Sequence, residues 1–375
     1  KMTHYERIHL AMAHKEPDRV PVMCQLSQGY MAKNGGEAPF DMYFNAESAA
    51  RAFFKTRKDL DFDGILLNVC FEDNWREIYE QTKAENTVNG ERYILPDGRV
   101  YENRNDQLTL IHDPGKEEKL MDIEDIEPDN IPLRLDYSDA MELHKLAVAE
   151  GKRESFSVHG EMVSPFDCLC VLLGLENALM AMITYGEKCE SILERYVNQC
   201  VALAKAQIDV GVDTMKITSP FAGGSFISPQ FYKRFVVPFE REVVRQIHTY
   251  APQIPVYTHT CGFISDRLEL MASSGIDGIE CMDPPPLGNT ELKDAKARVG
   301  DKLFLKGNMD SVNVLLQATP ESLEEYVRDL IRDGMCGGGY ILSSACSVAP
   351  NVKPEILKLL VPLAEKYGRY AAFSE

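Results

Sequence analysis

The sequence predicts an α/β protein that folds as one (β/α)8 barrel. Eight short apolar runs recur along the 375 residues, helical patterns lie between them, and several of these helices end in a glycine turn before the next run. Continuous apolar runs are typical of parallel strands that are buried on both faces. Eight strand–helix units in a chain of this length favour a barrel. A doubly wound open sheet is the alternative, but no Gly-x-Gly-x-x-Gly fingerprint follows the first strand.

The expected strands are short and spread along the whole chain. They cover residues 20–24, 64–70, 155–163, 214–219, 255–259, 278–282, 303–307 and 340–344. Helical patterns cover residues 192–210, 229–250, 264–274, 321–333 and 354–367. Gly211, Gly275 and Gly334 come just before expected strands, where a glycine normally stops the preceding helix.

One segment interrupts this alternation. Asp97 and Gly98 stand between two apolar runs, which is typical of a hairpin turn. We expect a β-hairpin insert over residues 75–114, after strand two, and then an acidic connector over residues 116–139. An insert after a barrel strand would lie at the catalytic rim of a single domain that spans residues 1–375. A dimer contact or a surface decoration is the alternative role.

Composition restricts the classes of partner. The chain has 58 acidic and 40 basic residues, a formal charge of −18, which argues against nucleic acid or an anionic membrane as the main partner. The sequence lacks an uncharged apolar run of about 18 residues, so no transmembrane helix is expected. The N-terminus lacks the apolar core of a signal peptide, and the ten cysteines then suggest reduced thiols. A cytoplasmic location is therefore expected.

A histidine and two cysteines suggest a metal site. His259 and Cys261 lie two residues apart at the end of strand five, so an extended chain places them on one side. Cys346 comes just past strand eight, at the same end of the expected barrel. Imidazole and thiolate together suit Zn²⁺, and three protein ligands would leave one position open for chemistry. The alternative is that the cysteines are packed core residues.

Other polar residues follow the expected strands and are candidate site residues. Glu280 is a candidate fourth zinc ligand or a base beside the metal, with orientation of His259 as the alternative. Glu161 and Asp310 are further candidate catalytic residues, although Asp310 would serve equally as a helix cap. Gln25 and Asn308 are candidate cofactor-binding residues. The remaining cysteines, including Cys168 and Cys170, are expected to be buried core residues.

The chain as a whole resembles the uroporphyrinogen decarboxylase superfamily. The resemblance lies in Glu6-Arg7, in residues 14–22, in the turn Gly307-Asn308-Met309-Asp310, and in residues 346–351 followed by Pro354-Glu355. It implies a (β/α)8 barrel. The metal-free decarboxylases of this superfamily carry Arg and Asp after strand one, to hold the substrate's carboxylates. Residues 23–30 of this chain contain neither, so uroporphyrinogen decarboxylation is disfavoured.

The other branch of the superfamily consists of corrinoid-dependent methyltransferases, marked by a zinc-binding His-x-Cys and a distant Cys. His259, Cys261 and Cys346 match that mark. The resemblance therefore implies zinc, a small methylated substrate and a cobalamin carried by a partner corrinoid protein, because the chain has no Asp-x-His-x-x-Gly motif. A homodimer is common in this superfamily.

The direction of methyl transfer has two readings. Transfer from an aryl methyl ether to cobalamin, an O-demethylation, is favoured by the aromatic residues Trp75, Tyr79, Tyr93 and Tyr101 of the insert, which are suited to line an aromatic substrate. Transfer from methylcobalamin to a thiol of the coenzyme M type is favoured by the charge that two thiolates place on zinc. We expect the ether reaction, with the thiol reaction as the alternative. A zinc lyase or hydrolase, or a decarboxylase-like lyase, is less favoured.

Overall fold

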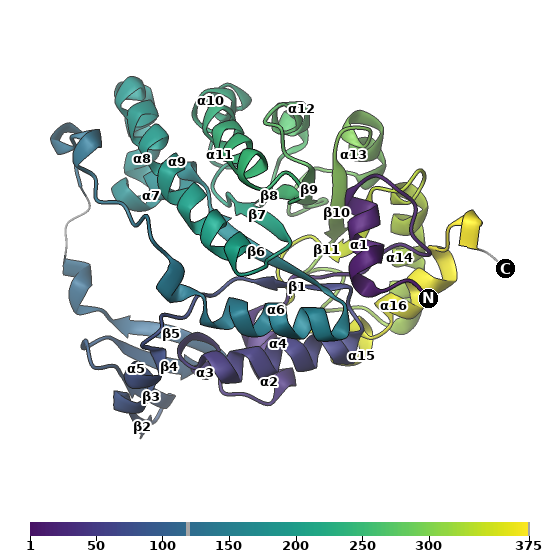
Figure 1. The fold of residues 1–375 in the computed structure, drawn as a ribbon, viewed down its shortest axis with the longest axis horizontal. Coiled ribbons are helices and arrows are strands. Elements are labelled where there is room, and N and C mark those ends of the chain that lie inside the picture. The colour runs from purple at the N-terminus through teal and green to yellow at the C-terminus, as the bar shows by residue number, and fades with distance from the viewer. Residues whose placement is uncertain (118–120, 374–375) are drawn as a thin grey trace.

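The computed structural model describes residues 1–117 and 121–373 and shows a parallel β-sheet surrounded by helices (Figure 1). Seven strands form this sheet in the order β1-β6-β7-β8-β9-β10-β11. Their bounds are β1 Gly64–Leu67, β6 Ser157–Val163, β7 Thr214–Thr218, β8 Val256–Thr260, β9 Gly278–Cys281, β10 Phe304–Met309 and β11 Tyr340–Ser344. The strands are buried almost throughout, as their apolar sequences predict.

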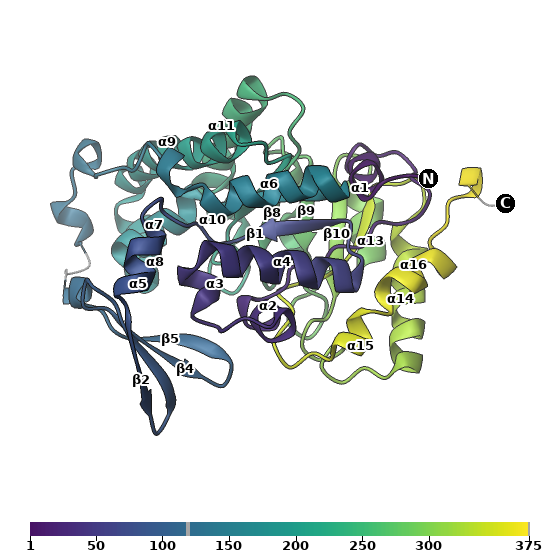
Figure 2. The ribbon, with the colours of Figure 1, turned by 60° about the horizontal axis from the view of Figure 1, so that its bottom comes forward.

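Helices alternate with these strands and pack around them (Figures 1 and 2). Their bounds are α1 His4–Met12, α2 Gln28–Gly35, α3 Asp41–Phe44, α4 Ala46–Leu60, α5 Trp75–Gln81, α6 Glu142–Glu154, α7 Pro165–Leu173, α8 Leu175–Thr184, α9 Gly186–Asp209, α10 Pro229–Phe235, α11 Val237–Tyr250, α12 Leu268–Ala272, α13 Leu292–Val299, α14 Pro320–Gly334, α15 Pro354–Leu357 and α16 Leu360–Tyr367. The single helix expected over 229–250 is two helices, because Pro238 lacks the N–H that would continue the first one.

The segment expected as the first strand, residues 20–24, differs from the prediction. It forms isolated bridges instead of a ladder, and Val22 pairs with Leu342 of β11. Leu342 N donates to Pro21 O (2.8 Å), and on the other side Asp63 N, just before β1, donates to Val22 O (2.9 Å). Pro21 has no N–H to donate, which limits the pairing. This closing segment, residues 20–24, nevertheless lies between the two end strands, so the sheet curls back on itself.

The insert after β1 is larger than the expected hairpin. It begins with α5 and continues as a four-stranded antiparallel sheet in the order β2-β3-β4-β5 (Lys83–Thr87, Gly90–Ile94, Val100–Arg104, Gln107–His112). Gly98 has a φ of 89° and lies in the turn between β3 and β4, as expected. Asn105 and Asp106, both with positive φ, form a second turn, which the sequence analysis did not identify.

The insert lies beside the main sheet, away from α1 (Figure 2). Asp106 of the turn between β4 and β5, and Leu108 of β5, line a small cavity together with Gly29 of α2 and Pro350, which follows β11. The expected connector contains the short 3-10 turns Ile123–Asp125, Pro128–Asn130 and Ser138–Ala140, while its residues 118–120 lie outside the described part of the chain.

Within the described residues, no single helix is long and apolar enough to cross a membrane. The helices α7 and α8, which meet at an angle of 105°, are together long and apolar enough for a membrane span, by length and composition alone.

Helix α1 closes the amino-terminal end of the sheet. Ile8 and Met12 of α1 pack in one apolar cluster with Leu66, Tyr257 and other inward-facing strand residues. Apolar side chains therefore fill this end, and the polar residues that follow the strands gather at the opposite, carboxyl-terminal end.

A buried carboxylate fastens α1 and the closing segment to β1. Asp63 is fully buried and accepts from Arg7 Nη1 (2.8 Å), Arg19 Nη1 (3.2 Å) and Val22 N (2.8 Å), and His4 Nδ1 lies at 2.8 Å. Although burial raises the pKa of Asp63, the charges of Arg19, Arg7 and His4 lower it to about 2. The ion pair thus joins three segments that are distant in sequence.

We predict that Asp63→Asn lowers the free energy of unfolding by roughly 3–5 kcal/mol at pH 7, because it leaves buried guanidinium groups without their charge partner. In the wild type this stabilisation is present above the ordinary pKa of an aspartate and is lost as the pH falls toward 2. Denaturant unfolding at pH 7 and pH 3 measures both effects. Asp59→Asn, at an exposed pair with Lys55, is the control and should change stability by about 0.5 kcal/mol or less. Equal losses of stability in the two variants would contradict the role of Asp63 as the charge partner of the buried guanidinium groups.

Candidate metal centre

Four side chains meet at the carboxyl-terminal ends of β8, β9 and β11. One ligand atom each from His259, Cys261, Cys281 and Cys346 lies within 4.8 Å of all the others. His259 Nε2 is 3.3 Å from Cys261 Sγ, Cys281 Sγ is 3.4 Å from Cys346 Sγ, and Cys346 Sγ is 3.8 Å from Cys261 Sγ. One nitrogen and three sulfurs form a compact, largely buried donor set.

The predicted ligands His259, Cys261 and Cys346 are therefore brought together, although Cys261 and Cys346 are 85 residues apart in the sequence. His259 lies in β8, and Cys261 follows that strand directly. The chain then turns sharply at Gly262, whose φ of 81° favours glycine and whose N–H donates to Asp283 Oδ2 (2.8 Å). Cys346 is held by its own N–H, which donates to Ser311 Oγ (2.9 Å).

Glu280 holds the imidazole and is not one of the four clustered donors. Its Oε2 accepts from His259 Nδ1 (2.6 Å), which directs Nε2 toward the sulfur of Cys261. Burial and the charge of Lys216 lower the pKa of His259, but its hydrogen bonds to Cys261 and Glu280 raise the pKa above its ordinary value. The geometry fits the alternative reading of Glu280, an orienting residue, better than a direct ligand.

Two buried lysines accompany this carboxylate. Lys306 Nζ donates to Glu280 Oε1 (2.6 Å) and Lys216 Nζ lies 2.9 Å from Oε2, while all three side chains are about 1–2% exposed. Burial raises the pKa of Glu280, but the two lysines lower it well below the ordinary value. Glu280 is therefore an anion that three partners share.

Neither lysine was among the site residues predicted from the sequence. Their position does indicate a buried charge, because Lys216 and Lys306 each lie inside an apolar run predicted as a buried strand. A lysine in that position must find a charged partner.

Lys216 also gathers two of the predicted site residues. Its Nζ donates to Gln25 Oε1 (2.6 Å) and lies 3.4 Å from Glu161 Oε2. Burial lowers the pKa of Lys216, but Glu280 and Glu161 raise it above its ordinary value. Gln25, Glu161 and Glu280 thus form one polar network around a lysine beside the donor set.

The two remaining candidates have local structural contacts. The Asn308 side chain donates to Met282 O (2.9 Å) and Thr290 O (3.1 Å), which holds the loop after β9. Asp310 Oδ1 accepts from Val312 N (3.0 Å) and Asn313 N (2.8 Å), so it caps the backbone of a turn and not of a helix, which was the alternative role predicted for it. Neither contact places these side chains against the four donors.

Cys281 was expected to be a core residue, and the structure places it in the donor set. In a regular strand it would face away from Glu280, its neighbour. Its φ of 78° and the φ of 55° at Met282 take the chain out of the extended conformation at this point. No periodicity argument predicts such a change of direction.

The three thiols differ in acidity. Hydrogen bonds from Cys281 and Cys346, and one with His259, lower the pKa of Cys261 far below its usual range. The same cluster, through the bond to Cys261, raises the pKa of Cys346, and burial raises that of Cys281. The cluster therefore already favours a thiolate at Cys261, the form that binds metal.

Two buried acids lie on helices behind this end of the sheet. Glu240 of α11 is 2% exposed and accepts from Ser219 Oγ (3.1 Å). Burial and the charge of Asp167 raise the pKa of Glu240 to about 8, and burial raises that of Asp167 of α7 to about 7. Both acids therefore titrate close to neutral pH.

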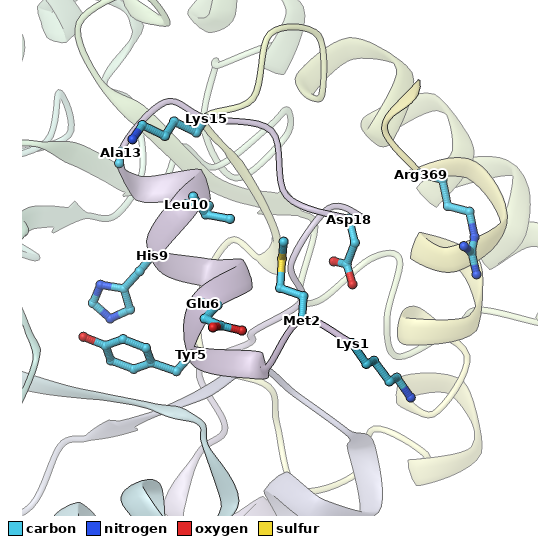
Figure 3. Close-up of a pocket in the computed structure, with 10 residues that line it drawn as sticks. All are labelled: Lys1, Met2, Tyr5, Glu6, His9, Leu10, Ala13, Lys15, Asp18 and Arg369. Atoms are coloured by element: carbon cyan, nitrogen blue, oxygen red, sulfur yellow. The ribbon is translucent and has the colours of Figure 1, made fainter. Parts of the chain in front are cut away.

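A cavity of about 870 Å³ lies elsewhere, along α1 (Figure 3). Tyr5 and His9 line it on one side of the helix, and His9 bonds to Ser157 and Asp213 at the amino-terminal ends of β6 and β7. This cavity therefore lies at the opposite end of the strands from the four donors.

The arrangement can be compared with known proteins. Residues 110–367, more than half of the chain, match the family described as uroporphyrinogen decarboxylase (URO-D). The chain belongs to this family. The resemblance inferred from residues 6–22, 307–310 and 346–355 is confirmed.

Relatives in this family are enzymes of two kinds. A methylcobamide:CoM methyltransferase of Methanosarcina acetivorans is 24% identical over 221 residues, 59% of this chain and 61% of the relative. A methylated-thiol–coenzyme M methyltransferase of Methanosarcina mazei is 27% identical over 200 residues, 53% and 50% of the two chains. A uroporphyrinogen decarboxylase of Ruthia magnifica is 29% identical over 185 residues, 49% and 48%. The chain thus matches about half to three fifths of these relatives.

A solved structure of a methyltransferase from Methanosarcina mazei matches the fold. Its TM-score is 0.75 at 18% identity, covering 98% of this chain and 99% of that one. This URO-D family chain therefore has the same α/β architecture over nearly its whole length.

We predict that Glu240→Gln becomes more stable than the wild type as the pH rises. The wild-type side chain has a folded pKa of about 8 against an ordinary 4.5, so its ionisation destabilises the fold increasingly between those values, at about 1.4 kcal/mol per pKa unit. Glutamine avoids this cost. Unfolding free energies of both proteins at pH 5, 7 and 9 measure it.

The difference between variant and wild type should grow across this range and level off above pH 8. Glu242→Gln on the same helix is the control, because the pKa of Glu242 is lowered to about 2 by its bonds to Arg245 and Gln246. A difference in unfolding free energy between Glu240→Gln and the wild type that stays constant with pH would contradict the raised pKa of Glu240.

Proposed function

We propose that this protein is a zinc-dependent methyltransferase that moves a methyl group between a corrinoid and a small thiol. The observation that carries the proposal is the donor set of His259, Cys261 and Cys346 at one end of the strands, within a chain whose relatives include methylcobamide:CoM methyltransferases. The cysteine and histidine donors have the softness that Zn²⁺ prefers.

The residues fit a bound metal in their details. Glu280 fixes the imidazole and leaves Nε2 aimed at Cys261, as an outer carboxylate does in zinc sites. Lys216 and Lys306 keep that carboxylate ionised. Bound Zn²⁺ would supply a Lewis acid that lowers the pKa of a substrate thiol.

The chain's own groups have separate roles in this reaction. His259, Cys261 and Cys346 hold the metal, and Glu280 orients His259 by accepting its Nδ1–H. Glu161 is 20% exposed and, with Gln25, presents polar atoms beside Lys216. We assign these two residues to the substrate side of the network, and Asn308 and Asp310 to holding the loops that frame it.

A thiol is favoured over an aryl methyl ether by two observations. Two of the aromatic residues that favoured the ether are used in packing the insert against α3 and the residue before it: Tyr93 stacks on Phe40 (4.1 Å between centroids) and Tyr101 meets Phe44 edge-on (5.1 Å). Thiolate donors, in turn, leave a bound substrate thiolate nucleophilic. The corrinoid would come on a partner protein, since the sequence has no motif for binding it.

The test combines metal analysis with methyl-transfer assays. Wild-type protein should carry about one zinc per chain and should demethylate methylcobalamin in the presence of a small thiol. His259→Ala should lose both properties because it removes one of the ligands. His112→Ala, an exposed histidine of the insert, should keep both.

Other outcomes separate the alternatives. Methylation of Co(I) cobalamin by an aryl methyl ether would make the protein an O-demethylase component. Zinc without methyl transfer would indicate a zinc lyase or hydrolase, and turnover of uroporphyrinogen a decarboxylase. Wild-type protein without zinc would overturn the proposal.

We predict that Glu280→Gln weakens zinc binding by about 10–100-fold, because the glutamine carries no charge to stabilise the oriented imidazole. Competition with a fluorescent zinc chelator measures the affinity. Glu291→Gln, at the start of α13 and away from the donor set, is the control. Equal zinc affinity in the wild type and Glu280→Gln would show that Glu280 does not support the metal.

A further inference from the structure

We propose that Cys281 is a fourth protein donor of the metal centre, which binds the metal in the resting enzyme and is displaced when the thiol substrate arrives. The inference rests on the proposed function for the identity of the incoming thiol. Its structural basis is the convergence of one nitrogen and three sulfurs, from three strand ends, within 4.8 Å.

Cys281 is positioned as a donor. Its side chain is fully buried, and its sulfur is 3.4 Å from that of Cys346. Cys281 directly follows Glu280 in β9. Glu280 is paired in register with His259 of the neighbouring strand β8, and its carboxylate orients that histidine. One short segment of β9 therefore supplies both a donor and the group that orients another donor.

The backbone at Cys281 explains how the sulfur reaches the cluster. Strand alternation would place neighbouring side chains on opposite faces, yet Glu280 and Cys281 both serve this site. The chain achieves this with positive φ at Cys281 (78°) and Met282 (55°). Such conformations are unfavourable in residues other than glycine, so the surrounding structure must hold them.

The two neighbouring carboxylates have other partners than the full set of donors. Asp283 Oδ2 accepts from Gly262 N (2.8 Å), and the Asp283 oxygens lie 3.4 and 3.6 Å from the Cys346 sulfur, one member of the cluster. Glu280 is taken up by His259, Lys216 and Lys306. Cys281 is thus the side chain of this region whose donor atom lies among the other three.

Four protein donors would close a zinc site, whereas catalysis requires one open position. Displacement of Cys281 resolves this conflict. The incoming thiol loses its S–H proton, the departing Cys281 sulfur takes that proton, and the number of sulfur donors stays at three. We assign Cys281 as the leaving donor because Cys346 is anchored through Ser311 and Cys261 through its contact with His259 Nε2.

The test uses the full chain loaded with Co²⁺, whose thiolate charge-transfer absorption reports the number of bound sulfurs without any turnover. Wild-type protein should show three thiolates, and Cys281→Ser two, a loss of about one third of the intensity. Zinc affinity should also fall roughly tenfold or more, since even an outer-shell change has that effect. Cys189→Ser, a buried cysteine of α9, is the matched control and should behave as the wild type.

Titration of the Co²⁺-loaded wild type and Cys281→Ser with 2-mercaptoethanol then tests the displacement. The wild-type intensity should stay constant because one sulfur replaces another. The Cys281→Ser intensity should rise by about one half, from two sulfurs to three.

Two outcomes would overturn the proposal. One is a Cys281→Ser spectrum identical to the wild type. The other is a wild-type intensity that rises on thiol addition, which would show an open position and no bound Cys281. Both outcomes concern the ligands alone, so they are distinct from a failure of the methyl-transfer assays.

Discussion

The interaction on which the site depends is the buried carboxylate of Glu280. It meets His259 of β8, Lys216 of β7 and Lys306 of β10, and all three partners reach it within 2.9 Å. A charge removed from water is tolerated only when its partners replace the lost hydration. Here the partners are spread over adjacent strands, so the sheet must be correctly assembled before the charge is satisfied. The imidazole is thereby fixed in one orientation.

The two ends of the strands differ in polarity. At the amino-terminal end, α1 covers an apolar cluster and is fastened by Asp63, whose partners lie on α1 and on the closing segment. At the carboxyl-terminal end, the chain leaves β8, β9, β10 and β11 in loops that carry cysteine or carboxylate residues. Burial and ion pairing thus make one end a rigid base, while the other end presents the donor atoms.

Several elements were predictable because they are encoded locally. The strands from β6 to β11 follow from continuous apolar runs, and α14 follows from Pro320 and the Thr319 cap. Residues 20–24 were expected as an equal strand, but Pro21 and the position between β1 and β11 reduce them to isolated bridges. The insert was underestimated, because only one of its three turns was predicted, and the turn at Asn105 and Asp106 uses positive φ without glycine. The aromatic residues of the insert were visible in the sequence, but the stacking of Tyr93 on Phe40 depends on tertiary contact.

Local patterns in the sequence were enough to predict the alternation of strands and helices. They also grouped His259, Cys261 and Cys346 as predicted metal ligands, because such ligands follow simple rules of spacing and residue type. The other contacts of the site could not be predicted in this way. Glu280 bonds to His259 and is not among the four clustered donors, Gln25 and Glu161 gather around Lys216, and Cys281 joins the cluster. These contacts depend on which face each strand presents and where the backbone departs from regular geometry. Both are set by contacts between segments that lie far apart in the chain, so no local pattern records them.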